Sequence, residues 1–187
     1  MHPVAPPLVL GFLLCASGFV LASEPTAAQR FSDFLARDWE RQMRESPTWA
    51  SSLGDRRYND RWEDLSLPAI EQRHRADLAS IDALKSIPRD YDLFLRMRAT
   101  DVAEHALGLW LGTPVDAYRG LPTSVLGVPQ TLRFDTEQDY RDWLARLESM
   151  PALIEQYRGI LQDGVHRKIT QPRIVAARIP DRIGDLL

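Results

Sequence analysis

A compact cluster of charged residues within the segment 45–66 offers the clearest prospect of chemistry in this chain. The cluster consists of Asp55, Arg56, Arg57, Tyr58, Asp60 and Arg61. Arginine binds carboxylates through two parallel hydrogen bonds, so the cluster would suit a peptide C-terminus or an acidic side chain. The same arginines would also pin the segment by pairing with carboxylates nearby, and we favour this intramolecular network. Those carboxylates are Asp55, Asp60, Glu63 and Asp64.

Three aromatic residues accompany the charged cluster, namely Trp49, Tyr58 and Trp62. A loop that carries function is usually held in place by a rigid scaffold. We therefore expect these three side chains to anchor the segment 45–66 to the helices on either side of it.

The histidines offer little for metal chemistry. Beyond the first residues they are His74, His105 and His166, and no two have the spacing of a helical His-x-x-x-His pair. We expect His105 to be a core residue bonded to a carboxylate such as Asp101. His74 and His166 stand among arginines and lysines and are expected at the surface. Asp101, Glu104 and His105 would make an acid–base set, but no nucleophile accompanies them. No catalytic or metal-binding residue is assigned.

The segment 45–61 has the order Glu-x-Pro-x-Trp-Ala-x-x-Leu-Gly-Asp-x-Arg-Tyr-x-Asp-Arg, followed by Asp-Leu-Ser at 64–66. This order resembles the N-terminal signature of the DUF885 family, which comprises bacterial, largely helical, often secreted proteins. Weaker matches follow at 91–94, 136–147 and 171–173. Family members are longer and resemble zinc metallopeptidases, with a His-Glu-x-x-x-x-His motif far downstream. The resemblance implies zinc for the full-length family only, and this chain has no such motif.

Composition limits the classes of function. The chain is 44% hydrophobic and 26% charged with a net charge of -3, which fits a globular protein and gives no basic footprint for nucleic acid. Residues 1–22 read as a secretory signal peptide with cleavage before Ser23, or as an uncleaved membrane anchor. Cys15, the only cysteine, lies within that signal. We therefore expect a periplasmic or secreted protein held together by its core, without disulfides.

Helical periodicity dominates the rest of the chain and predicts an all-α, bundle-like array of five to six helices. The predicted helices begin and end at 26–46, 66–87, 90–112, 136–149, 150–164 and 172 onward, with a short turn of helix between Ser46 and Gly54. Ser46 and Ser66 are the expected N-caps, and Thr136-Glu137 is expected to start the helix at 136–149. No strand-like alternation persists. The resemblance makes this array the N-terminal lobe of a larger helical metallopeptidase-like fold.

Residues 112–135 interrupt the helical pattern with several glycines and prolines, which predicts a long irregular segment. Such a segment would line a substrate cleft or pack on a partner lobe. The pattern also runs on to Leu187 without a helix-stop signal, which we interpret as truncation. Two functions remain open. In the first, residues 23–187 are the catalytically incomplete N-terminal part of a secreted zinc-peptidase-like protein, partnered by a C-terminal catalytic region or by self-association. In the second, the chain is a small exported helical binding module without catalysis.

Overall fold

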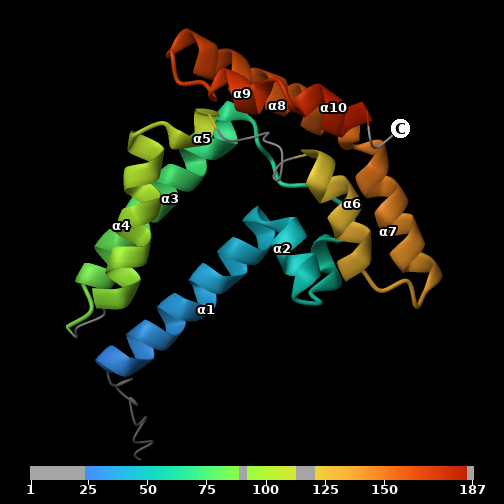
Figure 1. Cartoon of the computed structure of the whole chain (residues 1–187). Coiled ribbons are helices and arrows are strands. Elements are labelled where there is room, and N and C mark those ends of the chain that lie inside the picture. Colours follow the sequence, from blue (N-terminus) through green and yellow to red (C-terminus); the bar gives the residue numbers. More distant parts are fainter. Residues whose placement is uncertain (1–23, 89–91, 113–120, 185–187) are drawn as a thin grey trace, which may run out of the picture.

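The structure is a computed structural model that describes residues 24–88, 92–112 and 121–184. Every regular element in these ranges is helical, which confirms the predicted all-α class and bundle-like array (Figure 1). The predicted signal peptide, residues 1–22, lies outside the described residues. None of the helices described is both long and apolar enough to span a membrane.

The helices follow one another as α1 (Ala27–Glu45), α2 (Pro47–Ser52), the 3-10 turn η1 (Arg56–Tyr58), α3 (Leu67–Lys85), α4 (Asp92–Ala106), α5 (Leu109–Gly112), α6 (Leu121–Thr131), α7 (Glu137–Glu148), α8 (Met150–His166), α9 (Arg173–Ala176) and α10 (Ile179–Gly184). The predicted helix at 90–112 is divided into α4 and α5 at Gly108, which adopts a φ of +68°. The last predicted helix is also divided, into α9 and α10.

The predicted caps set the helix boundaries. The side chains of Ser66 and Thr136 accept hydrogen bonds from backbone N–H groups in the first turns of α3 and α7. Thr26 caps α1 in the same way, and Gln29 completes a capping box by accepting from the Thr26 N–H. Ser46 precedes α2 but makes no side-chain cap, so that helix begins at Pro47 through its favourable φ alone.

The first hydrophobic core joins α1, α3 and α4. Phe34 of α1 packs with Leu84 and Ile87 near the end of α3. Phe94 of α4 covers this cluster, and its ring meets that of Phe31 edge-on with centroids 5.4 Å apart. The apolar stripes read from the sequence therefore face one another, and α3 and α4 lie side by side beside α1 (Figure 1).

The second core corrects the prediction for residues 112–135. Residues 121–131 form α6, and Val128 of that helix is buried against Trp62 and Leu153. Pro129 lies inside α6 and removes one backbone donor. Burial of the α6 face outweighs that local cost, since the same face adds Val125 to the core. The sequence prediction was wrong there because propensity is a weak guide where tertiary packing is strong. Residues 113–120 lie outside the described residues.

Helix α7 buries few of its apolar side chains. Tyr140 and Leu144 are exposed, whereas Trp143 packs into the second core. The buried side chains of α7 are instead Asp139 and Arg146. The helix is therefore turned toward a polar network under the segment 45–66.

Candidate functional site

A cavity of about 710 Å³ opens between α3, α4, α5, α6 and α8. Its polar lining consists of Glu63, Arg73, His74, Asp77, Asp101, Glu104, His105, Ser124 and Tyr157. Trp110 and several aliphatic side chains complete the walls. The volume falls in the range typical of small-molecule sites, and the mixture of apolar walls with a few polar groups is typical of them as well. We take this cavity as the candidate site.

Two histidines meet inside the cavity although they lie on different helices. The rings of His74 on α3 and His105 on α4 stack with centroids 3.8 Å apart and planes 10° from parallel. Trp110 stacks on the other side of His105 at 5.7 Å. Glu71 faces His105, with 3.3 Å between its Oε1 and the His105 Nε2. The prediction of a carboxylate partner for His105 is confirmed, but the partner is Glu71 of α3.

The prediction for His74 was wrong, because its side chain is half-buried in the stack and its Nδ1 atom is buried. His166 is exposed, as predicted. The helices place His74 opposite His105 through the register of α3 against α4, which no local pattern in the sequence reveals.

The stacked histidines do not fit a zinc site. A zinc ion lies in the plane of each imidazole ring that binds it, at about 2.0–2.1 Å from the nitrogen. Two nearly parallel planes separated by a stacking distance have no common point for such an ion. Among the residues described, no group of three or more His, Cys, Asp or Glu side chains is arranged to hold a metal.

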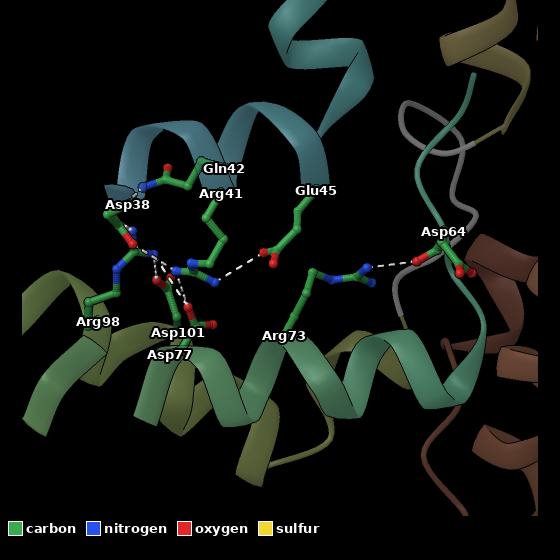
Figure 2. A network of polar contacts seen from close by, with 9 residues as sticks. All are labelled: Asp38, Arg41, Gln42, Glu45, Asp64, Arg73, Asp77, Arg98 and Asp101. Atoms are coloured by element: carbon green, nitrogen blue, oxygen red, sulfur yellow. Dashed lines mark hydrogen bonds and ion pairs between the residues drawn. The ribbon is translucent and has the colours of Figure 1, made fainter. Parts of the chain in front are cut away.

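An ion-pair network forms the wall between α1, α3 and α4 (Figure 2). Arg41 of α1 bonds Asp38 at 2.9 Å, Glu45 at 3.0 Å and Asp77 of α3 at 2.8 Å. Arg98 of α4 also donates to Asp38 and lies 3.6 Å from Asp77. Two arginines from different helices are thus clamped by shared carboxylates, which fixes the three helices relative to one another.

The network controls the ionisation of its carboxylates. Burial alone would raise the pKa of Asp38, but hydrogen bonds from Arg41 and Arg98 outweigh it and hold that pKa below its ordinary value. Asp101 behaves in the opposite way. Partial burial raises its pKa, Arg98 opposes the shift, and the charges of Asp77 and Glu104 add to it. The cavity lining as a whole contains the carboxylates of Glu63, Asp77, Asp101 and Glu104 and the guanidinium of Arg73.

Glu63 brings the segment 45–66 to the same cavity. Its side chain is half-buried and accepts a hydrogen bond of 3.4 Å from the Thr48 hydroxyl. Burial raises the pKa of Glu63, and the positive charge of Arg73 partly opposes the shift. Arg73 donates to the backbone oxygen of Asp64 at 2.7 Å, which holds it at the cavity rim (Figure 2). Tyr157 lies across the cavity, and burial followed by the charge of Glu63 raises its pKa.

The predicted charge cluster lies outside this cavity and forms an intramolecular network. Arg57 pairs with Asp55 at 2.6 Å and with Glu40 of α1 at 2.7 Å. Among the residues described, Arg61 pairs only with its neighbour Asp60, at 2.7 Å. These contacts agree with the structural interpretation, although Glu40 was not among the partners named from the sequence. Whether the cluster also binds a ligand remains a prediction.

Arg56 makes the longest-range ion pairs of the cluster among the residues described. It pairs with Asp135 at 2.7 Å and with Asp139 at 3.3 Å, at the start of α7. Asp139 also accepts hydrogen bonds from the side chain and backbone N–H of Thr136, and these hold its pKa below the ordinary value. Arg56 thereby connects η1 to the capping box of α7. The sequence did not reveal this pairing, because the partners are far apart along the chain.

Arg146 lies beneath the cluster with no exposed surface. One guanidinium nitrogen, Nη2, donates to the Ser51 hydroxyl at 3.0 Å and to the Tyr58 backbone oxygen at 2.6 Å. Burial lowers the pKa of Arg146 to about 10, while Asp60 leads the charges that oppose the shift. Arg146 was not singled out from the sequence, because a lone arginine between apolar residues of a helix gives no signal of burial.

The predicted aromatic anchors behave differently from one another. Trp62 is 9% exposed and sits in the second core, and Tyr58 is half-buried. Trp49 is 41% exposed and contacts Trp39 edge-on at 5.5 Å. The expectation that Trp49 is a buried anchor was wrong, because α2 presents that side chain along α1 and not into either core.

These features define an all-helical protein with an acidic, aromatic-walled cavity. A search of protein families matches residues 47–187 to DUF885, described as a bacterial protein of unknown function. The match covers most of the chain, so the chain belongs to the DUF885 family, as its resemblance indicated. A search of curated proteins and a search of solved structures each gave no match.

Proposed function

We propose that the chain is the N-terminal, catalytically incomplete part of a secreted or periplasmic DUF885 protein that resembles a zinc peptidase as a whole. Residues 23–187 supply a helical wall of a peptide-binding cleft, with the cavity between α3, α4 and α8 on that wall. A C-terminal region supplies zinc and the catalytic groups. Export follows from the predicted cleavage between Ala22 and Ser23.

The observation that carries this proposal is the exposure of large apolar side chains around the contact between α5 and α8. Leu107 and Val165 are both exposed. They directly adjoin Gly108 and Gly164, the two glycines at which an added Cβ would meet Ile169 and Leu111. Exposed apolar surface of this kind marks an interaction site, which supports docking of a C-terminal region or, without it, self-association.

The second candidate is a small exported binding module without catalysis. What favours it is the cavity itself, since residues of this chain line it. Reading the coding sequence downstream of Leu187 separates the two candidates. A His-Glu-x-x-x-x-His segment there supports the longer peptidase-like protein, and a stop codon with no such segment supports the binding module.

The biochemical test uses the exported chain, purified and analysed for bound zinc by elemental analysis and for hydrolysis of peptides. We expect no stoichiometric zinc and no cleavage sensitive to chelators, because a zinc peptidase needs three protein ligands and a general base. We also expect concentration-dependent self-association in analytical ultracentrifugation, weakened by Leu107→Ser. Stoichiometric zinc with chelator-sensitive cleavage would overturn the proposal, and a retained Met1 in the membrane fraction would overturn export.

A further inference from the structure

We propose that the cavity between α3, α4 and α8 binds a guanidinium group, as carried by the arginine side chain of a peptide. The inference rests on the proposed function in one respect, because it names the substrate class for the cleft wall. It is carried by the charge balance of the cavity, by the stack of flat rings on its wall and by its size.

Two carboxylates of the cavity form no ion pair with any residue that the structure describes. Asp77 and Asp101 lie close to Arg98, at 3.6 Å and 3.1 Å, so their charges are largely compensated. Glu63 accepts a hydrogen bond from the Thr48 hydroxyl, and the charge of Arg73 acts on it without an ion pair, because the Arg73 guanidinium donates to the Asp64 backbone oxygen. Glu104 has no ion pair or hydrogen bond among the residues described. The two carboxylates come from different elements, since Glu104 lies on α4 and Glu63 lies in the loop before α3. A cation between them would meet a carboxylate from each element.

The flat rings explain why a guanidinium suits the cavity better than another cation. Trp110, His105 and His74 form a continuous stack in which neighbouring planes are within 17° of parallel. A guanidinium is planar and weakly hydrated, so it stacks on aromatic faces while donating hydrogen bonds in its own plane. The His74 Nδ1 atom is buried without a hydrogen-bond partner in the part of the chain described, which is the kind of group that a ligand or a water satisfies.

One ionisation shift agrees with this arrangement. Burial raises the pKa of Glu63, so this carboxylate carries its charge at a cost when the cavity holds no cation. A bound guanidinium favours the charged form and lowers that pKa. By linkage, the affinity should rise as the pH increases through the range in which Glu63 ionises.

Calorimetry on the full exported chain tests the inference with matched ligands. The probe is Nα-acetyl-arginine amide, and the control is Nα-acetyl-citrulline amide, which has nearly the same shape but carries no charge. We expect the arginine compound to bind at least about tenfold more tightly, equivalent to about 1.4 kcal/mol. Spermidine, a flexible polyamine cation, distinguishes a free polyamine from a peptide side chain. Tighter binding of spermidine, equal binding of the two amides, or no binding at all would each overturn the inference.

Substitutions locate the binding within the cavity. Glu104→Gln removes an exposed, unpaired carboxylate, so it should fold normally and weaken binding about tenfold. Glu63→Gln should act in the same direction, and Trp110→Leu should remove part of the preference over spermidine. Glu148→Gln on α7 lies outside the cavity lining and is the matched control, with no change expected. Unchanged binding in a folded Glu104→Gln variant would sink the assignment.

The outcome is separable from that of the proposed function. Binding of the arginine compound together with zinc-dependent hydrolysis would keep this inference and overturn catalytic incompleteness. No binding together with no hydrolysis would overturn this inference alone.

Discussion

Arg146 and Trp62 make two contacts with each other, a cation–π contact and a hydrogen bond. The guanidinium carbon of Arg146 lies 5.3 Å from the centre of the Trp62 ring, and the Trp62 indole N–H donates to the Arg146 backbone oxygen at 2.7 Å. The same arginine bonds the Tyr58 backbone oxygen. One buried pair therefore joins the end of the segment 45–66 to α7, and Trp62 carries that segment into the second core.

This pairing predicts that alanine substitutions of Trp62 and Trp49 lower the free energy of unfolding by very different amounts. Trp62→Ala should lower the free energy of unfolding by about 3–5 kcal/mol, the range for losing a buried large aromatic side chain. It also removes one of the two side-chain donors to the Arg146 backbone oxygen, which keeps its hydrogen bond from the Ser149 hydroxyl. Trp49→Ala removes a side chain that is 41% exposed and should cost well under half as much. Denaturant midpoints compare the two directly, and equal losses would show that the depth of Trp62 is not what stabilises the segment.

The Asp38 network predicts acid sensitivity. The pKa of Asp38 lies below its ordinary value of 3.8, so its contribution to stability is complete above about that pH and is lost as the pH falls through the lower folded value. Asp38→Asn should cost about 3 kcal/mol at neutral pH, the lower end for removing one partner of a buried ion pair. The difference between variant and wild type should shrink below about pH 4.

Asp82→Asn is the control for this prediction. Asp82 lies on α3, is largely exposed and faces Lys85 at 3.9 Å, so its contribution should be close to nothing at any pH. Denaturant unfolding at several pH values measures both variants. A difference between Asp38→Asn and wild type that stays constant into acid would mean that the Asp38 charge is not the stabilising feature.

The sequence predicted the helices far better than their relative placement. Local signals such as the Thr26 and Thr136 capping boxes mark boundaries through contacts within a few residues, and those boundaries are confirmed. The prediction failed for α6, where Pro129 and Gly127 suggest a loop but burial of Val128 sustains a helix. Local preference and tertiary burial conflicted there, and burial was stronger.

The candidate site was largely beyond sequence reasoning for a related reason. Its two histidines come from helices whose register is fixed by Phe34 packing on Leu84 and by the Asp38 network, and neither relationship has a local signature. A spacing rule for metal ligands detects only pairs on one helix. The charge cluster was visible because it is contiguous. Only its local pairs, Asp55 with Arg57 and Asp60 with Arg61, followed from the alternation of arginine and aspartate.

The charge cluster yields a prediction that distinguishes its members. Arg56 joins η1 to Asp135 and Asp139, so Arg56→Gln should cost about 0.5–1 kcal/mol, the upper part of the range for exposed ion pairs. Among the residues described, Arg61 pairs only with its neighbour Asp60, so Arg61→Gln should leave stability within about 0.5 kcal/mol of wild type. Urea unfolding at low and high salt measures the stability of both variants relative to wild type. If neither substitution changes stability, the structural interpretation of the cluster is wrong and ligand binding becomes the better one.

Two glycines of α8 predict effects of opposite sign. A Cβ on Gly164 would lie 2.7 Å from the Ile169 backbone oxygen and 3.0 Å from the Leu111 backbone oxygen, so α8 and α5 would have to separate. Gly164→Ala should therefore cost about 1–3 kcal/mol, as overpacking does. A Cβ on Gly159 would have no atom within 4 Å. Gly159→Ala should therefore stabilise the helix by about 0.5–1 kcal/mol. Thermal unfolding of both variants measures the contrast. Stabilisation by both alanines would mean that α5 and α8 do not approach through Gly164, and the exposed side chains of Leu107 and Val165 would then no longer belong to one surface.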